Sequence, residues 1–164
     1  MTQAMEEREL RLDRMRYVKN TSSSRLCYLG ILFNVLYFVS IYKSDVASWY
    51  YQILVGASIV YNLLFMLMVF LASEGVKNYQ KNYSILLCVL GAGQIARIFI
   101  LPLQAHRAVV KVSGAETIVM QNPQFIRVVI YLTLSAVSLI AAAVINWNKS
   151  SALEAHIAKS GQQA

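Results

Sequence analysis

The residue with the strongest chemical character in the apolar part of this sequence is an arginine. Arg97 lies inside a long apolar run, and Gln94 lies one helical turn before it, so both side chains occupy nearly the same face of a helix. A charge at the centre of a bilayer costs about 3 kcal/mol or more, and no Asp or Glu occurs inside any long apolar run of the chain. Three outcomes stay open for Arg97. It extends toward the headgroups, it pairs with an acid on another chain, or it holds an anionic ligand or backbone carbonyls.

Polar side chains recur at similar depth in the other long apolar runs. Together with Arg97 they form a candidate intramembrane polar layer, which consists of Asn34, Asn62, Gln94, Arg97, Ser135 and Ser138. An unpaired amide in hydrocarbon costs several kcal/mol, so we expect these groups to face one another rather than lipid. The layer has two interpretations. It either joins the helices by hydrogen bonds worth about 0.6–2 kcal/mol each, or it lines a path for a substrate or an ion.

The sequence lacks the patterns that an enzyme or a cofactor-binding membrane protein would need. His106 and His156 both lie outside the apolar runs, which leaves no histidine for haem ligation within a bilayer. No Cys-x-x-Cys, HExxH, acidic metal cluster or Ser/His/Asp set is found. Cys27 and Cys88 are too few for a disulfide framework or a zinc site. We therefore expect no catalytic residue, no metal and no cofactor.

The run that carries Arg97 also has the features of a closely packed helix. Small residues repeat along it at a spacing of four, and they are Ser84, Cys88, Ala92 and Ala96. Such a stripe lets two helix backbones approach closely, either within one bundle or between chains. Pro102 follows in the same run and frees the carbonyl of Ile98, so we expect a local kink there.

These residues must be positioned by membrane helices. A helix that crosses the hydrocarbon core needs about 20 apolar residues. Four runs qualify, at residues 26–42, 49–72, 84–104 and 125–147. The composition agrees, because the chain is 57% hydrophobic and 14% charged, whereas soluble domains are about 25% charged. The sequence therefore predicts an all-α integral membrane protein with a four-helix membrane domain over residues 26–147.

The basic residues are distributed unequally between the two sides of the predicted bundle. Ten of the 15 Lys and Arg residues lie on the side of the termini, four lie on the other side or at its edge, and Arg97 lies inside a span. The positive-inside rule then places both termini in the cytoplasm. Small size and compact loops suggest a bacterial plasma membrane. The net charge of +7 is expected to meet anionic headgroups, chiefly through the N-terminal basic segment, rather than nucleic acid.

Three segments lie outside the predicted bilayer. Residues 1–25 predict a basic amphipathic helix and a linker in which Thr21 to Ser24 end the helix, and residues 148–164 predict a polar tail. Residues 107–121 predict an extracytoplasmic β-hairpin between the third and fourth spans, because two β-branched runs flank a turn at Gly114. A lone hairpin is marginal in water, so we expect it to pack on its own helix ends, on lipid or on another chain.

These features favour a non-enzymatic multi-pass subunit that assembles with or stabilises a larger membrane complex, such as a transporter. The small-residue stripe, the hairpin and Arg97 are the reasons. The alternative is a self-assembling channel or small transporter with a polar mid-membrane pathway. A third interpretation is a lipid-binding or lipid-modifying protein that uses Arg97 against a headgroup. The expected partners are the lipid bilayer and other membrane protein chains, identical or different.

Overall fold

The computed structural model describes residues 2–15, 17–41, 49–112, 115–118 and 120–161. Within them, four helical segments are long and apolar enough to cross a membrane, and they are Thr21–Ile41, Gly56–Lys77, Asn82–Arg107 and Asn122–Lys159. The chain therefore has the architecture of a multi-pass helical membrane protein. This coarse outcome agrees with the spans expected from the apolar runs.

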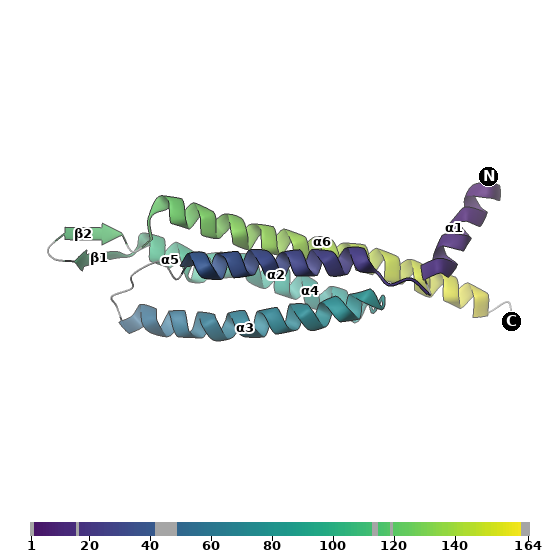
Figure 1. Ribbon diagram of the computed structural model, residues 1–164, viewed down its shortest axis with the longest axis horizontal. Coiled ribbons are helices and arrows are strands. Elements are labelled where there is room, and N and C mark those ends of the chain that lie inside the picture. The colour runs from purple at the N-terminus through teal and green to yellow at the C-terminus, as the bar shows by residue number, and fades with distance from the viewer. Residues whose placement is uncertain (1, 16, 42–48, 113–114, 119, 162–164) are drawn as a thin grey trace.

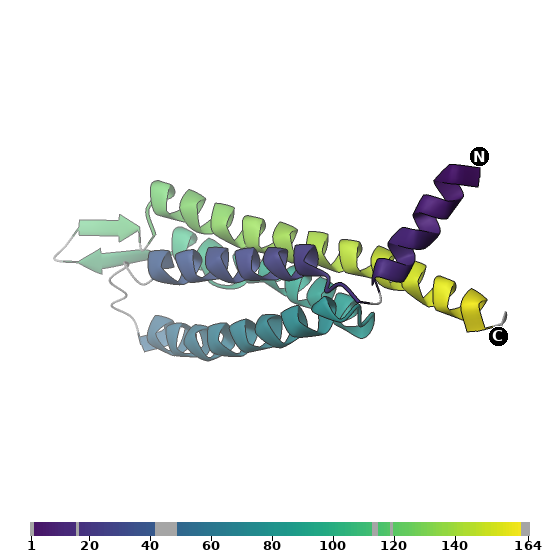
Figure 2. The same ribbon diagram turned by 45° about the vertical axis from the view of Figure 1, so that its right-hand side comes forward.

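The elements form an elongated bundle. In chain order they are α1 (Thr2–Met15), α2 (Thr21–Ile41), α3 (Trp49–Lys77), α4 (Asn82–Ile100), α5 (Pro102–Arg107), β1 (Val109–Val112), β2 (Ala115–Ile118) and α6 (Asn122–Gly161). The four long helices α2, α3, α4 and α6 run side by side, with α1 and the end of α6 at one end of the bundle and the two strands at the other (Figures 1 and 2). We call these the terminal end and the strand end.

The first long helix begins earlier than the sequence suggested. Thr21 to Ser24 form the first turn of α2 instead of separating it from α1. The N–H of Ser24 donates to the carbonyl of Asn20 at 3.5 Å, which places Asn20 at the start of the helix. Asparagine, serine and threonine favour helix N-termini because their side chains can satisfy free backbone groups there. The break between α1 and α2 therefore falls between Met15 and Thr21.

The third span is interrupted where the kink was expected. α4 ends at Ile100, Leu101 has φ −111° and ψ −53°, and Pro102 is the first residue of the short helix α5. Proline has no N–H to donate to the carbonyl four residues earlier, so the α4 hydrogen-bond pattern cannot continue through it. Helical hydrogen bonding resumes at once, because the N–H of Ala105 donates to the carbonyl of Leu101 at 2.9 Å.

The last helix extends well past the bundle. α6 has 40 residues, which corresponds to about 60 Å at the usual helical rise, twice the thickness of a hydrocarbon core. Residues 148–161, expected as a polar tail, are helical, because helix-forming residues continue up to Gly161. α1 packs against this extension, where His156 Nε2 lies 3.4 Å from Asp13 Oδ1.

The strand end carries two short antiparallel strands. β1 pairs with β2 in a register that places Val109 opposite Ile118 and Val112 opposite Ala115. The pairing is shorter than the expected 107–121 segment at both ends, since Arg107 belongs to α5 and β2 ends at Ile118. Gly114, the expected turn residue, lies outside the described residues.

Apolar side chains fill the bundle in two clusters. The cluster toward the terminal end consists of Cys27, Phe65, Val69, Ala72, Val76, Leu87, Leu139, Ala142 and Ala143. The cluster toward the strand end consists of Tyr37, Ile41, Leu101, Ala105, Met120, Val128 and Leu132. In α2 and in α6, which contribute to both clusters, Asn34 and Ser135 fall between the residues of one cluster and those of the other.

Candidate functional site

Arg97 lies in the interior of the bundle. Only 6% of the surface of this residue is exposed. Nη2 of Arg97 donates to Ser58 Oγ at 2.7 Å, and Nη1 donates to Asn62 Oδ1 at 2.7 Å and to Asn34 Oδ1 at 3.4 Å. The guanidinium of α4 is therefore bound by neutral oxygen atoms of α2 and α3. Of the outcomes left open by the sequence, extension toward the headgroups does not fit this burial.

Two aromatic rings complete the surroundings of the guanidinium. The Arg97 Cζ atom lies 4.4 Å from the ring centroid of Tyr37 and 4.7 Å from that of Tyr61. Tyr37 is fully buried, whereas Tyr61 is 38% exposed on the outside of the bundle. A ring face attracts a cation, more strongly where water is excluded. The two tyrosines thus help to offset the cost of a charge at this depth.

Gln94 connects the arginine to the last helix. Its Nε2 donates to Asn34 Oδ1 at 3.0 Å and to Ser135 Oγ at 3.4 Å. Ser135 in turn donates to the carbonyl of Gly30 at 2.9 Å. The hydrogen bonds join all four long helices in one network. We call the residues that form this network the polar layer, and they are Asn34, Ser58, Asn62, Gln94, Arg97 and Ser135.

The polar layer is not fully satisfied. Nδ2 of Asn34, Nδ2 of Asn62 and Oε1 of Gln94 are buried and have no hydrogen-bond partner among the described residues. Ser138 does not join the layer, because its hydroxyl donates to the carbonyl of Leu134 in its own helix at 2.7 Å. A serine on a membrane helix commonly bonds to the carbonyl four residues earlier, which removes the need for a partner across the bundle.

The small-residue stripe of α4 does not pack inside the bundle. Ser84 is buried, but Cys88, Ala92 and Ala96 are exposed. The close approach of α4 to α6 occurs instead at Gly91, where a Cβ atom would lie 2.8 Å from Ile140 Cγ1 and 3.3 Å from the carbonyl oxygen of Ala136. Within this chain Gly91, and not the stripe, therefore makes the close contact with α6, and packing of the stripe between chains stays a prediction.

An apolar groove adjoins the exposed stripe. It has a volume of about 240 Å³ and lies between α4 and α6 near the terminal end. It is lined by Ser84, Ile85, Cys88, Ala143, Val144, Trp147 and Asn148. Because Cys88 belongs to both, the groove and the stripe form one outward-facing apolar surface, which we call the α4 surface.

A second polar cluster closes the bundle at the terminal end. Asn146 Nδ2 donates to Ser84 Oγ at 2.8 Å and to the carbonyl of Gln80 at 3.0 Å. Asn20 Nδ2 donates to Asn146 Oδ1 at 3.1 Å, and Lys149 Nζ donates to Asn20 Oδ1 at 3.1 Å. These bonds fix the start of α2 and the α3–α4 turn to α6, which explains why α6 stays in contact with the bundle at this end.

Several of these residues were missed by reasoning from the sequence. Ser58 lies one helical turn before Asn62, and Tyr37 lies one turn after Asn34, so helical spacing places each beside a residue that was chosen. Such spacing is the signal that could have found them. Asn20 and Asn146 carry no comparable signal, because both lie near the ends of their apolar runs, where polar residues are common.

The site residues offer no set of groups for a metal ion. Within the described part of the chain, no three His, Cys, Asp or Glu side chains come together. Cys27 is buried and Cys88 is exposed, and both are free thiols. What the arrangement provides is a fixed, buried cation and a network of neutral hydrogen-bonding groups.

Comparison with known proteins does not extend this description. No protein-family model, no curated protein and no solved structure matches the chain. Fold and site together define a class, which is a multi-pass membrane protein whose described residues include four helical segments long and apolar enough to cross a bilayer.

Proposed function

We propose that this chain is a non-enzymatic membrane subunit that assembles with, or stabilises, a larger membrane complex. The observation that carries the proposal is the α4 surface. Cys88, Ala92 and Ala96 are exposed along one side of α4 and continue an apolar groove of about 240 Å³. The proposed occupant is an apolar helix of another membrane protein chain.

The chemistry of the α4 surface supports a helix as its occupant. Lipid tails are as apolar as leucine, so apolar burial alone gives helices little reason to associate in a bilayer. Small residues change this balance, because they let a partner backbone approach closely and gain van der Waals contact. Cys88, Ala92 and Ala96 place such residues on successive turns, while Trp147 forms part of the groove wall.

The interior of the bundle supports the same choice over a channel. The Arg97 guanidinium is engaged by Ser58 and Asn62 at 2.7 Å each, and its residue is 6% exposed. A group held in this way binds its own bundle together and is poorly placed to pass ions or substrates. The function is therefore assigned to the outer surface, with the polar layer as the device that holds the surface rigid.

The proposed setting is a plasma membrane of bacterial type with both termini in the cytoplasm. The excess of basic residues on the terminal side supports this orientation. α1 and the extension of α6 then form a cytoplasmic contact region, and the strands β1 and β2 form an extracytoplasmic one. Both are further surfaces for the same complex.

Extraction in mild detergent followed by native mass measurement tests the proposal. The expected result is this chain with a different chain in fixed stoichiometry, and a discrete homo-oligomer without another chain would refute it.

Ala92→Leu fills the stripe and is expected to reduce the amount of bound partner at least tenfold. Ala57→Leu, at an exposed position of α3, is the matched control and should leave the partner bound. A folded Ala92→Leu variant that kept the partner at the wild-type ratio would place the interface away from the α4 surface.

A further inference from the structure

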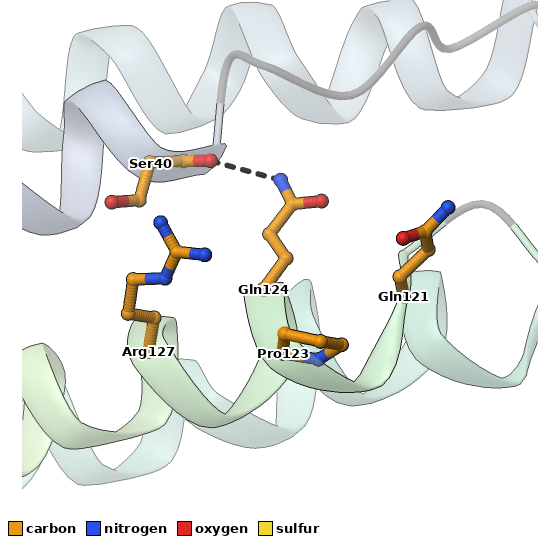
Figure 3. A pocket seen from close by; sticks show the side chains of 5 residues that line it. All are labelled: Ser40, Gln121, Pro123, Gln124 and Arg127. Carbon is orange, nitrogen blue, oxygen red and sulfur yellow. Dashed lines mark hydrogen bonds between the residues drawn. The ribbon is translucent and has the colours of Figure 1, made fainter.

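A second pocket lies at the strand end of the bundle, far from the α4 surface along the molecule. It has a volume of about 210 Å³ and is lined by Ser40, Gln121, Pro123, Gln124 and Arg127. Ser40 belongs to the last turn of α2, and the other four belong to the start of α6 and the residue before it. Figure 3 shows the side chains of Gln124 and Arg127 directed from α6 toward Ser40, across the gap between the two helices.

The pocket is rich in hydrogen-bond donors and contains one cation. Gln124 Nε2 donates to the carbonyl of Ser40 at 2.9 Å, which fixes the width of the gap between α2 and α6. The hydroxyl of Ser40 and the amide of Gln121 add further polar groups, and none of the lining residues is acidic. Among the described residues, Arg127 takes part in no ion pair. Such a set suits a ligand with anionic oxygen atoms.

The position of the pocket narrows the class of ligand. Arg127 lies within the first two turns of α6, with the exposed apolar residues Ile126 and Ile130 beside it. This is the depth at which a long cationic side chain reaches the headgroup region of a bilayer. The guanidinium binds phosphate oxygens in a bidentate manner, and hydroxyl and amide groups can bind the substituent of a phosphodiester.

We propose that this pocket binds the phosphodiester headgroup of a phospholipid in the leaflet at the strand end. The Arg127 guanidinium holds the phosphate oxygens, and Ser40 and Gln121 contact the hydroxyl groups of the headgroup. The bound lipid sits between the end of α2 and the start of α6 and adds to the contact that Gln124 makes between them. This site is independent of the α4 surface and of any partner chain.

Lipid retention by the full chain is the direct test. Protein in mixed micelles is titrated with phosphatidylglycerol and the bound lipid is counted by native mass spectrometry. Arg127→Gln is expected to weaken binding about tenfold or more, as for the loss of a charge-assisted hydrogen bond. Arg107→Gln, which removes an exposed arginine of α5 outside the pocket, should leave the affinity unchanged. Equal losses in both variants would reduce the effect to general surface charge and overturn the proposal.

Two further measurements separate the possible sources of the ligand. Inorganic phosphate alone, added at millimolar concentration, should fail to displace the lipid, because the apolar surroundings contribute to retention. Displacement by phosphate would show a soluble anion site instead. Ser40→Ala keeps the backbone carbonyl that Gln124 uses, so its fold should persist. Ser40→Ala is expected to weaken the binding of phosphatidylglycerol and to leave unchanged the binding of a lipid that lacks headgroup hydroxyls. If the wild-type protein bound both lipids equally, the proposed role of Ser40 would be contradicted.

Discussion

At the scale of the residue, the behaviour of Arg97 rests on geometry as much as on charge. Its fork donates to Ser58 and Asn62 at the same distance, 2.7 Å, while two tyrosine rings flank it. A lysine ammonium is a compact point charge and cannot reproduce a planar fork. Arg97→Lys keeps the charge and changes the shape of the group, whereas Arg97→Leu removes both. The two substitutions therefore separate the effect of the charge from the effect of the shape.

We predict that the stability of the bundle falls in the order wild type, Arg97→Lys, Arg97→Leu. The leucine variant leaves the buried oxygens of Ser58 and Asn62 without their donor, which costs about 1–3 kcal/mol for each unsatisfied group. The lysine variant keeps the charge and one of the bonds. Thermal unfolding in detergent measures the order. Ile95→Leu, at an exposed position of the same helix, controls for the change in composition.

A wild-type stability of Arg97→Leu would point to a different role for the polar layer. Removal of a buried charge also removes the cost of desolvating it, and this gain opposes the loss of the hydrogen bonds to Ser58 and Asn62. If Arg97→Leu were as stable as the wild type, the polar layer would not hold the helices together. Its residues would then have to be explained by a transport path, which is the alternative function.

At the scale of the element, the contact between α4 and α6 depends on Gly91. A Cβ atom there would lie 2.8 Å from Ile140 Cγ1, whereas a Cβ atom at Gly56 of α3 would meet nothing within 4 Å. We predict that Gly91→Ala destabilises the bundle by about 1–3 kcal/mol through overpacking. Gly56→Ala should be neutral or stabilise by up to about 1 kcal/mol, since alanine favours the helix. Unfolding of both variants in one detergent measures the contrast, and equal effects would contradict it.

The same contact shows what sequence reasoning can and cannot supply. Helix length and apolar character locate the spans, because a bilayer leaves few other solutions. The depth of a polar residue then follows from its place in the run, which is why Asn34, Asn62, Gln94, Arg97 and Ser135 could be grouped from the sequence. Ser138 was grouped with them on the same ground, but its hydroxyl bonds within α6. Depth does not give the rotation of a helix about its axis. Cys88 and Gly91 lie within one turn of each other, and only packing against α6 decides that Gly91 faces inward.

At the scale of the whole molecule, the two ends of the bundle differ in their elements and in their number of basic residues. The terminal end carries α1 and the extension of α6, and the strand end carries β1 and β2 (Figure 2). Their arrangement follows from four antiparallel passes, which return the chain to the side where it began. By the positive-inside rule we expect the terminal end to face the cytoplasm, because ten basic residues lie on that side against four opposite.

We predict that the strand end is accessible from outside the cell and the terminal end is not. Val109 is 56% exposed and Lys159 is exposed, so a cysteine at either position should react with a maleimide that reaches it. In a chain with Cys27→Ala and Cys88→Ser, a membrane-impermeant maleimide should label Val109→Cys in intact cells and spare Lys159→Cys. Both should react after permeabilisation, which controls for local shielding. Labelling of Lys159→Cys alone in intact cells would invert the orientation and move the phospholipid pocket at Arg127 to the cytoplasmic leaflet. The pocket's chemistry would be unchanged, because it is defined by its position at the strand end of the bundle.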